Sequence, residues 1–271
     1  MAGPGDVPGS SGDTRATSVG ATPASAPAGR LFVGTSGFSY PAWAPQFYAP
    51  GTRSGDLLAS YAMRLSCCEL NNTFYRHPTE AGIAAWCAAT PEAFRFAVKA
   101  QRGGSMRALL ADPIGTVPWL SAPYRHFGSR LGCVLFRVPA EVPRDDDRLA
   151  ALLAAWPADL PLTVECRDPS WAVDEVFDLL QAAGAAWCST DLDADPGPPT
   201  LRLTASWLYI RLRREGYTDA ELGAWADRLV PFLDGGRDTY VVFRHDADGA
   251  SPLRALRLAE LVAARRTAAS A

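Results

Sequence analysis

The chain has 271 residues, a length that fits one α/β barrel or two smaller domains, and 48% of its residues are hydrophobic. A formal net charge of −3 excludes a broad electrostatic attraction to nucleic acid or to an anionic membrane. No apolar run approaches the roughly 18 residues of a membrane helix, so we expect no membrane partner. The six cysteines form no CxxC pair, which favours reduced thiols in a cytoplasmic protein over disulfides or a zinc site.

The start of the chain differs in composition from the rest. Residues 1–29 are mostly Gly, Pro, Ala, Ser and Thr without an apolar segment, which predicts a disordered tail. From Arg30 onwards, short apolar runs alternate with amphipathic stretches. Strands are predicted at Leu31–Thr35, Cys67–Leu70, Phe94–Lys99, Leu131–Val138, Leu162–Cys166, Ala185–Ser189, Trp207–Leu212 and Thr239–Phe243. Helices are predicted from near Ser54 and at Glu80–Ala89, Asp146–Ala155, Val173–Ala183, Asp219–Leu233 and Pro252–Arg265.

Two connections depart from this alternation. Between the third and fourth strands, the apolar residues from Leu109 to Leu120 predict a helical excursion broken by Pro113 and Pro118. After the sixth strand, the Pro- and Gly-rich segment Asp195–Thr200 replaces most of a helix.

Eight strands that alternate with helices predict a single (β/α)8, TIM-barrel-like α/β domain over residues 30–266, followed by a short tail at residues 267–271. The alternative is an open, doubly wound sheet, which often carries a glycine-rich phosphate turn after its first strand. The segment Gly34-Thr35-Ser36-Gly37 lacks the GxGxxG spacing and precedes a long loop instead of a helix. The barrel is therefore favoured.

Polar residues gather at the carboxyl end of nearly every predicted strand. In a barrel these ends converge on one face, where the active sites of this fold lie. The candidate site residues at these ends are Ser36, Tyr40, Trp43, Glu69, Asn71, Thr73, Tyr75, Lys99, Arg137, Glu165, Arg167, Arg211, Arg213, Arg244 and His245.

Four of these charges carry more weight, because Glu69, Lys99, Glu165 and Arg211 each lie within or close an apolar run. A buried charge must be paired or neutralised by a shift of its pKa. One interpretation is an ion-pair lattice inside the barrel mouth, for instance between Glu165 and Arg211. The other, which we favour, is a ligand site.

Several stretches resemble the YecE-like family, also called domain of unknown function 72. They include VGTSGFSYPAW, CELNNTFYRHPT, FRFAVKA, VECRDPSW, YIRLR and VVFRHDADG, and the resemblance covers roughly Leu31 to Leu261. It implies a TIM-barrel-like fold with an uncharacterised function. The recurrent polar and aromatic residues that it implies match Ser36, Tyr40, Trp43, Glu69, Asn71, Thr73, Phe74, Tyr75, Lys99, Glu165, Arg167, Ser170, Trp171 and Arg211.

The chain departs from the family pattern in one direction. Arg137 stands where Gln is usual, Asp168 where His is frequent, and Arg213 where a His is common. Arg244-His245 replaces an Asn pair after the eighth strand. These replacements predict a more cationic mouth and put a transfer of detailed roles from the family in doubt.

Two borrowed activities fit the residues poorly. The chain has three histidines, His77, His126 and His245, too few for a polynuclear zinc nuclease site. Glu69 and Glu165 come from nearly opposite strands, farther apart than we expect for the carboxylates of a retaining glycosidase, which are about 5 Å apart. We expect no metal site and no cofactor, although a single Mg²⁺ on Glu69, Glu165 or Asp191 stays open.

The remaining chemistry centres on Lys99, the only lysine among 26 basic residues. A lysine at a strand end suits Schiff-base chemistry, but pairing with Glu69 or with a substrate anion is favoured. We predict an enzyme for a small phosphate- or carboxylate-bearing substrate, with Glu69, Lys99 and Glu165 as its acid/base residues and the arginines and other polar residues binding the ligand. The alternative is a protein that binds or processes nucleic acid in the same arginine- and aromatic-lined cleft.

Overall fold

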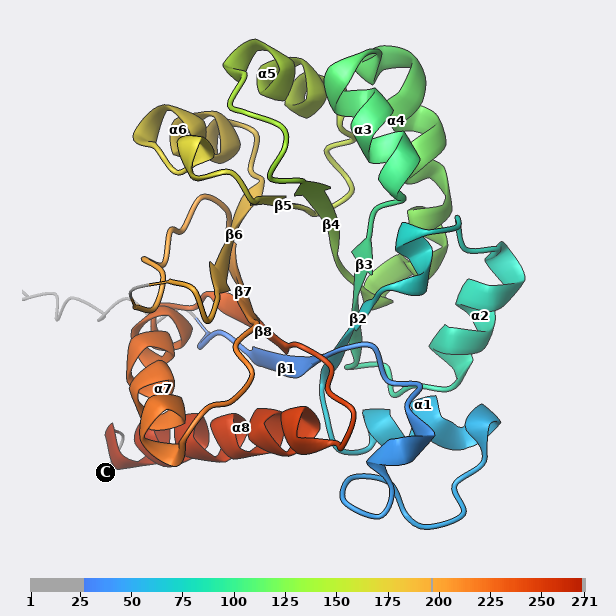
Figure 1. Ribbon diagram of the computed structural model, residues 1–271, viewed down its shortest axis with the longest axis vertical. Helices are drawn as coiled ribbons and strands as arrows, with labels where there is room; N and C mark the ends of the chain where they lie inside the picture. The colour runs from blue at the N-terminus through green and yellow to red at the C-terminus, as the bar shows by residue number, and fades with distance from the viewer. Residues whose placement is uncertain (1–26, 196, 270–271) are drawn as a thin grey trace, which may run out of the picture.

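Eight parallel strands form a closed barrel in sequential order in the computed structural model, which describes residues 27–195 and 197–269. Figure 1 shows this ring of strands with the helices around it. The predicted (β/α)8 barrel is confirmed, with β8 pairing back onto β1. The strands are β1 (Leu31–Ser36), β2 (Cys67–Leu70), β3 (Arg95–Lys99), β4 (Leu131–Val138), β5 (Leu162–Cys166), β6 (Ala186–Asp191), β7 (Trp207–Leu212) and β8 (Asp238–Phe243).

The helices cover the outside of the barrel unevenly. They are α1 (Leu57–Ala62), α2 (Glu80–Ala88), α3 (Arg102–Leu110), α4 (Pro113–Ser121), α5 (Asp146–Ala155), α6 (Asp174–Ala182), α7 (Asp219–Asp234) and α8 (Ala250–Ala269). Two helices follow β3, and no helix connects β6 to β7 among the described residues, as the Pro- and Gly-rich segment predicted. None of the helices in this part of the chain has the length and apolar character needed to cross a membrane.

The excursion after β3 differs from the expectation at one proline. Pro113 lies at the start of α4, where its missing N–H would have no intrahelical partner anyway. Pro118, however, lies inside α4 and does not end it. The carbonyl that Pro118 leaves without a donor belongs to Ile114, an exposed residue that water can reach, so the helix continues.

Alternation along the strands divides the barrel interior into an apolar layer and a charged layer. Side chains two residues apart point to the same face of a strand. The lower layer holds Cys67, Cys133, Cys188, Tyr209 and Tyr240, which belong to one buried apolar cluster. Two residues further along these strands lie Glu69 on β2 and Arg211 on β7, both buried. Arg137 pairs in register with Glu165, and Thr190 with Arg211, so the charges share one level at the carboxyl end.

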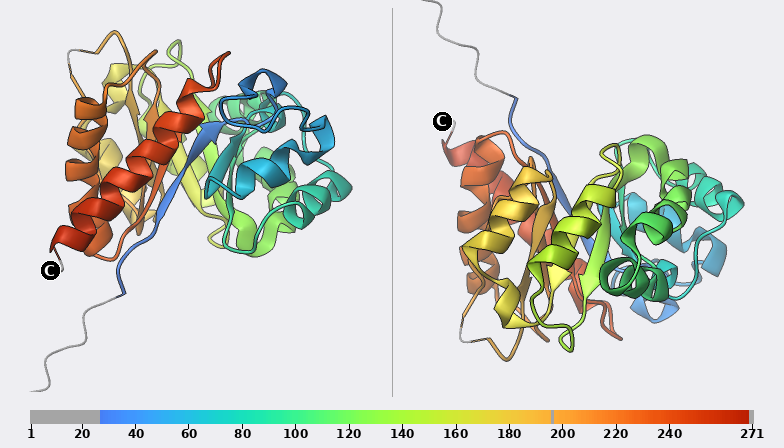
Figure 2. Two further views of the ribbon diagram at one scale, coloured as in Figure 1. Left: turned by 90° about the horizontal axis from the view of Figure 1, so that it is seen from below. Right: turned by 90° about the horizontal axis from the view of Figure 1, so that it is seen from above.

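Both ends of the described chain lie at the opposite, amino end of the barrel (Figure 2). The amide of Gly29 donates to the carbonyl of Leu233 at 2.7 Å, and Arg266 Nη1 donates to the Gly29 carbonyl at 3.1 Å. Of the expected tail, residues 1–26 lie outside the described residues. At the other end α8 continues to Ala269, beyond residue 266 where we expected the domain to end.

Candidate functional site

Arg211 lies at the centre of the charged layer and joins two carboxylates from different strands. Its Nη2 donates to Glu69 Oε1 at 2.7 Å, and its Nη1 donates to Glu165 Oε1 and Oε2, both at 2.8 Å. All three side chains are at most 2% exposed. The pairing of Glu165 with Arg211 is the one that the less favoured ion-pair interpretation named. The same guanidinium therefore links a carboxylate on β2 to one on β5.

Each carboxylate oxygen of Glu69 and Glu165 has a donor. Glu69 Oε2 accepts from the Tyr209 hydroxyl at 3.0 Å, and Glu165 Oε1 also accepts from Thr190 Oγ1 at 3.1 Å. Arg137 Nε lies 3.3 Å from Glu165 Oε2. Burial, the largest single cause, would raise the pKa of both carboxyls. Arg211 and the other neighbouring cations together outweigh it, so the pKa of Glu69 is lowered and that of Glu165 falls to about 2. Both groups are therefore carboxylates at neutral pH.

The mouth of the barrel holds more positive than negative charge. We call the following side chains the mouth cluster: Glu69, Lys99, Arg137, Glu165, Arg167, Arg211 and Arg213. Five of its members are cations and two are carboxylates. Burial and the neighbouring Arg211 lower the pKa of Arg213, whose buried Nη1 has no hydrogen-bond acceptor among the described residues. A partly buried surplus of like charge is costly unless an anion offsets it.

Lys99 closes β3 at this level but stays outside the ion pairs. Its side chain is 8% exposed, and its Nζ lies 4.4 Å from the centre of the Phe74 ring. Within the described part of the chain, its Nζ makes no hydrogen bond and no ion pair, so the expected pairing with Glu69 is wrong. The Glu69 oxygens accept from Arg211 and Tyr209 instead. Burial lowers the pKa of Lys99 to about 8, although Glu69 acts in the opposite direction.

A cavity of about 660 Å³ opens beside the mouth cluster, between the segments that follow β2, β3, β4 and β5. Its charged lining residues are three arginines and one glutamate: Arg102 from the start of α3, Arg137 from β4, Arg167 from just after β5, and Glu141. The ring of Phe74 forms another part of its wall, and the same ring contacts Lys99 Nζ. The cavity is of the size that small-molecule sites have. Lys99 does not line it, and Phe74 is the residue that both borders the cavity and contacts Lys99 Nζ.

A second group of predicted residues meets between the ends of β1, β2 and β8. The amide of Asn71 donates to Ser36 Oγ at 2.7 Å. The Tyr40 ring stacks on His245 with 5.2 Å between ring centres. Burial lowers the pKa of His245, and the adjacent Arg213 and Arg244 act in the same direction, so the imidazole is neutral at pH 7. None of these four side chains lines the cavity.

Three of the predicted ligand-binding residues lie apart from the ion pairs, each in a different environment. Trp43 is fully buried, and its indole N–H donates to the Asp246 carbonyl at 2.9 Å. The hydroxyl of Thr73 lies 2.8 Å from the Leu70 carbonyl and 2.7 Å from the Lys99 carbonyl, so it ties β2 to β3. Tyr75 points outwards with 77% of its surface exposed. The burial of Trp43 and the bonds of Thr73 to backbone carbonyls give these two residues structural roles.

Two residues of the site were not predicted from the sequence. Thr190 and Tyr209 donate to Glu165 and Glu69 and complete the coordination of the carboxylates. Tyr209 lies two residues before Arg211 on β7, and Thr190 pairs with Arg211 across β6 and β7. The sequence did carry a signal for Tyr209. Side chains two residues apart on a strand point to the same face, so Tyr209 points into the barrel as Arg211 does.

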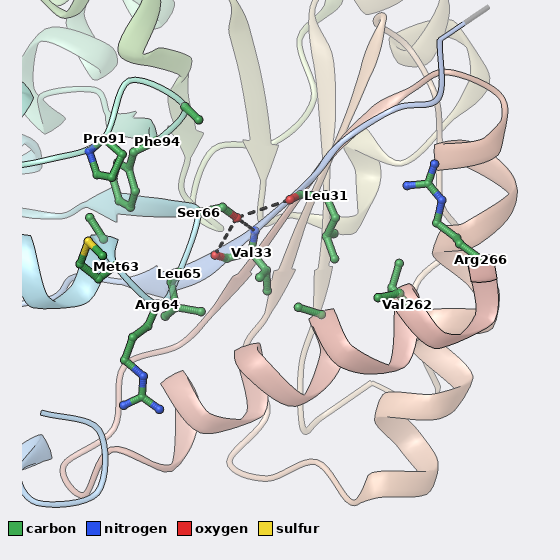
Figure 3. A pocket seen from close by; sticks show the side chains of 14 residues that line it. Leu31, Val33, Met63, Arg64, Leu65, Ser66, Pro91, Phe94, Val262 and Arg266 are labelled. Atoms are coloured by element: carbon green, nitrogen blue, oxygen red, sulfur yellow. Dashed lines mark hydrogen bonds between the residues drawn. The ribbon is translucent and has the colours of Figure 1, made fainter. Parts of the chain in front are cut away.

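A further cavity of about 470 Å³ lies outside the barrel, between β1, the segments before β2 and β3, and α8. Figure 3 shows Ser66 on its wall, with Oγ accepting from the Val33 amide at 2.8 Å. Arg64 and Arg266 are its charged residues, and it contains none of the predicted site residues.

The metal expectation concerns other side chains. Among the described residues, no group of three or more His, Cys, Asp or Glu side chains could hold a metal ion. Asp191, one of the three acidic residues considered for a single Mg²⁺, accepts a hydrogen bond from the Tyr217 hydroxyl at 2.9 Å.

Comparison with known proteins gives the family. The model of a protein family of unknown function, DUF72, matches residues 32–271. The chain belongs to the DUF72 family. It is 24% identical to the UPF0759 protein YunF of Bacillus subtilis over 263 residues, covering 79% of this chain and 89% of YunF.

Solved DUF72 structures share the fold. A DUF72 protein of Thermotoga maritima superposes with a TM-score of 0.73 at 23% identity, over 86% of this chain and 99% of that one. A DUF72 protein of Enterococcus faecalis gives a TM-score of 0.69 at 19% identity, over 86% of this chain and 96% of that one. These likenesses show the fold of the chain.

Proposed function

We propose that this DUF72 protein is an enzyme that binds a small phosphate- or carboxylate-bearing substrate in the cavity at the barrel mouth. The surplus of cations carries the proposal. The carboxylates of Glu69 and Glu165 are already paired with Arg211, while Arg102 and Arg167 present further charge to the cavity. Planar guanidinium groups bind phosphate and carboxylate with two parallel hydrogen bonds, which suits this arrangement.

Lys99 is the group best placed to move a proton. With a pKa of about 8, it exists in both protonation states near neutral pH, as general acid/base catalysis requires. Glu69 and Glu165 hold the guanidinium of Arg211, and Glu165 also holds Arg137. The contacts of Glu69 and Glu165 support a role in holding these arginines in place. That either carboxylate acts as a general base stays a prediction.

Thermal unfolding in inorganic phosphate, compared with sodium chloride at equal ionic strength, tests the anion site. Phosphate at about 100 times its Kd stabilises a protein by about 2.7 kcal/mol. For a domain of this size, that gain corresponds to a rise in Tm of roughly 5–10 °C. We expect Arg102→Gln to reduce the rise markedly, because it removes a charged hydrogen-bond donor from the cavity wall.

Arg125→Gln is the matched control, since Arg125 pairs with Asp159 at 2.9 Å and does not line the cavity. Its phosphate response should equal that of the unmodified protein. An equal Tm in phosphate and chloride, or an undiminished rise in Arg102→Gln, contradicts the proposal. A single-stranded oligonucleotide in the same assay separates the nucleic-acid alternative, which predicts stabilisation that falls steeply with salt and is absent with phosphate alone.

A further inference from the structure

The amine of Lys99 makes no hydrogen bond or ion pair among the described residues, although two carboxylates lie in the same charged layer. Arg211 and Tyr209 occupy the oxygens of Glu69, and Arg211, Arg137 and Thr190 surround those of Glu165. A lysine that served only to neutralise these carboxylates would contact one of them. Lys99 Nζ instead lies against the face of the Phe74 ring at 4.4 Å. Both carboxylates are therefore paired without this lysine.

The surroundings of Lys99 favour its neutral form. The side chain is buried, and the cationic Arg211 and Arg137 lie close enough to disfavour a further positive charge. A lysine with a pKa of about 8 is about one-quarter neutral at pH 7.5, against about 0.1% for an unperturbed lysine. A neutral amine carries the lone pair that attacks a carbonyl carbon, and desolvation beside other cations is a known way to produce one.

From these contacts we infer that Lys99 is a covalent nucleophile that forms an imine with an aldehyde or ketone substrate bearing a phosphate group. The inference rests on the proposed function, because the arginine-lined cavity is what would hold the phosphate. Arg102, Arg137 and Arg167 converge on that cavity, and Phe74 both borders it and contacts Lys99 Nζ. A substrate with its phosphate among the arginines would extend its carbonyl carbon past Phe74 towards the amine.

The step balances without an oxidant or a reductant. The Nζ lone pair attacks the carbonyl carbon, a C–N bond forms, and the π electrons move to the oxygen, which takes up the proton that nitrogen releases. The resulting carbinolamine accepts one more proton from solvent on its hydroxyl group. Water then leaves as the nitrogen lone pair forms the C=N bond, giving a cationic iminium. The iminium withdraws electrons from the adjacent carbon, which is how such lysines activate carbonyl substrates.

Trapping with sodium borohydride tests the inference, and the single lysine makes the result easy to assign. The intact protein is incubated with glycolaldehyde phosphate or with glycolaldehyde, reduced, digested and analysed by mass spectrometry. The N-terminal amine is an internal reference for unassisted reactivity. We expect at least about tenfold more labelling of Lys99 by the phosphorylated aldehyde, competition by inorganic phosphate, and equal labelling of the N-terminal amine by both aldehydes.

The outcomes separate the two proposals. A Lys99 that stays unlabelled, or that both aldehydes label equally without competition by phosphate, overturns the imine inference. If phosphate still raises the Tm in that case, the anion site stands and only the nucleophile is lost. Absence of both effects overturns both proposals. Arg102→Gln should reduce the preference of Lys99 for the phosphorylated aldehyde, whereas Arg125→Gln should leave it unchanged.

Discussion

Replacement of Arg211 by methionine is expected to lower the free energy of unfolding by about 3–5 kcal/mol, because it leaves two buried carboxylates without their shared partner. For a domain of this size, the corresponding fall in Tm is roughly 6–20 °C. Arg257→Met is the matched control. Arg257 pairs with Asp219 at the surface at 2.6 Å, and exposed pairs contribute about 1 kcal/mol or less.

Neutralising the carboxylates should reverse part of the loss. The triple variant Arg211→Met, Glu69→Gln, Glu165→Gln removes the uncompensated charges and should be more stable than Arg211→Met alone.

The pH dependence of the stability has a definite sign, because the folded-state pKa of Glu165 is depressed to about 2. The stability from its pairing is present above the unfolded pKa of about 4.3 and is lost as the pH falls towards 2. A loss in Arg211→Met no larger than in Arg257→Met contradicts the central position of Arg211.

Replacement of Lys99 by methionine is expected to raise the Tm at pH 7. The folded-state pKa of Lys99, about 8, lies below the unfolded value of about 10.4, so folding penalises its charged form. The penalty is fully present below pH 8, shrinks as the folded protein loses its proton first, and vanishes above about pH 10.4. Denaturation curves from pH 6 to pH 10 should therefore show a gain for Lys99→Met that decreases above pH 8.

The groups that face Lys99 set this behaviour. Glu69 on β2 and Glu165 on β5 raise its pKa, while Arg211 on β7 and Arg137 on β4 lower it together with burial, which is the largest cause. If Lys99 were a necessary member of the ion-pair lattice, its removal would destabilise the protein at pH 7. A lower Tm for Lys99→Met at that pH is the result that would contradict an unpaired amine.

The sequence predicted the architecture well because the strands of a barrel are buried on both sides. Runs such as Leu131–Val138 and Trp207–Leu212 are mostly apolar, which marks them as strands of a parallel sheet. The charges within such runs, Glu165 and Arg211 above all, were equally visible, because they interrupt apolar stretches. Their convergence at the mouth followed from the topology alone.

The detailed pairing within the site could not be predicted from the sequence. Whether Glu69 binds Lys99 or Arg211 depends on the register of β2 against strands distant in the chain and on the reach of each side chain. The same holds for Trp43 and Thr73, whose polar atoms bond to the backbone of other segments. Arg102 joins the site because α3 begins directly after β3, which directs that arginine to the cavity.

The measured pKa of Lys99 tests the central claim most directly. Reductive methylation with ¹³C-formaldehyde labels Lys99 and the N-terminal amine, and the Lys99→Arg variant, which has no lysine, identifies the N-terminal signal. The structure predicts that the Lys99 methyl resonance titrates with a midpoint near pH 8 in the folded protein. A midpoint above about pH 10, as in an unperturbed or carboxylate-paired lysine, would contradict the account.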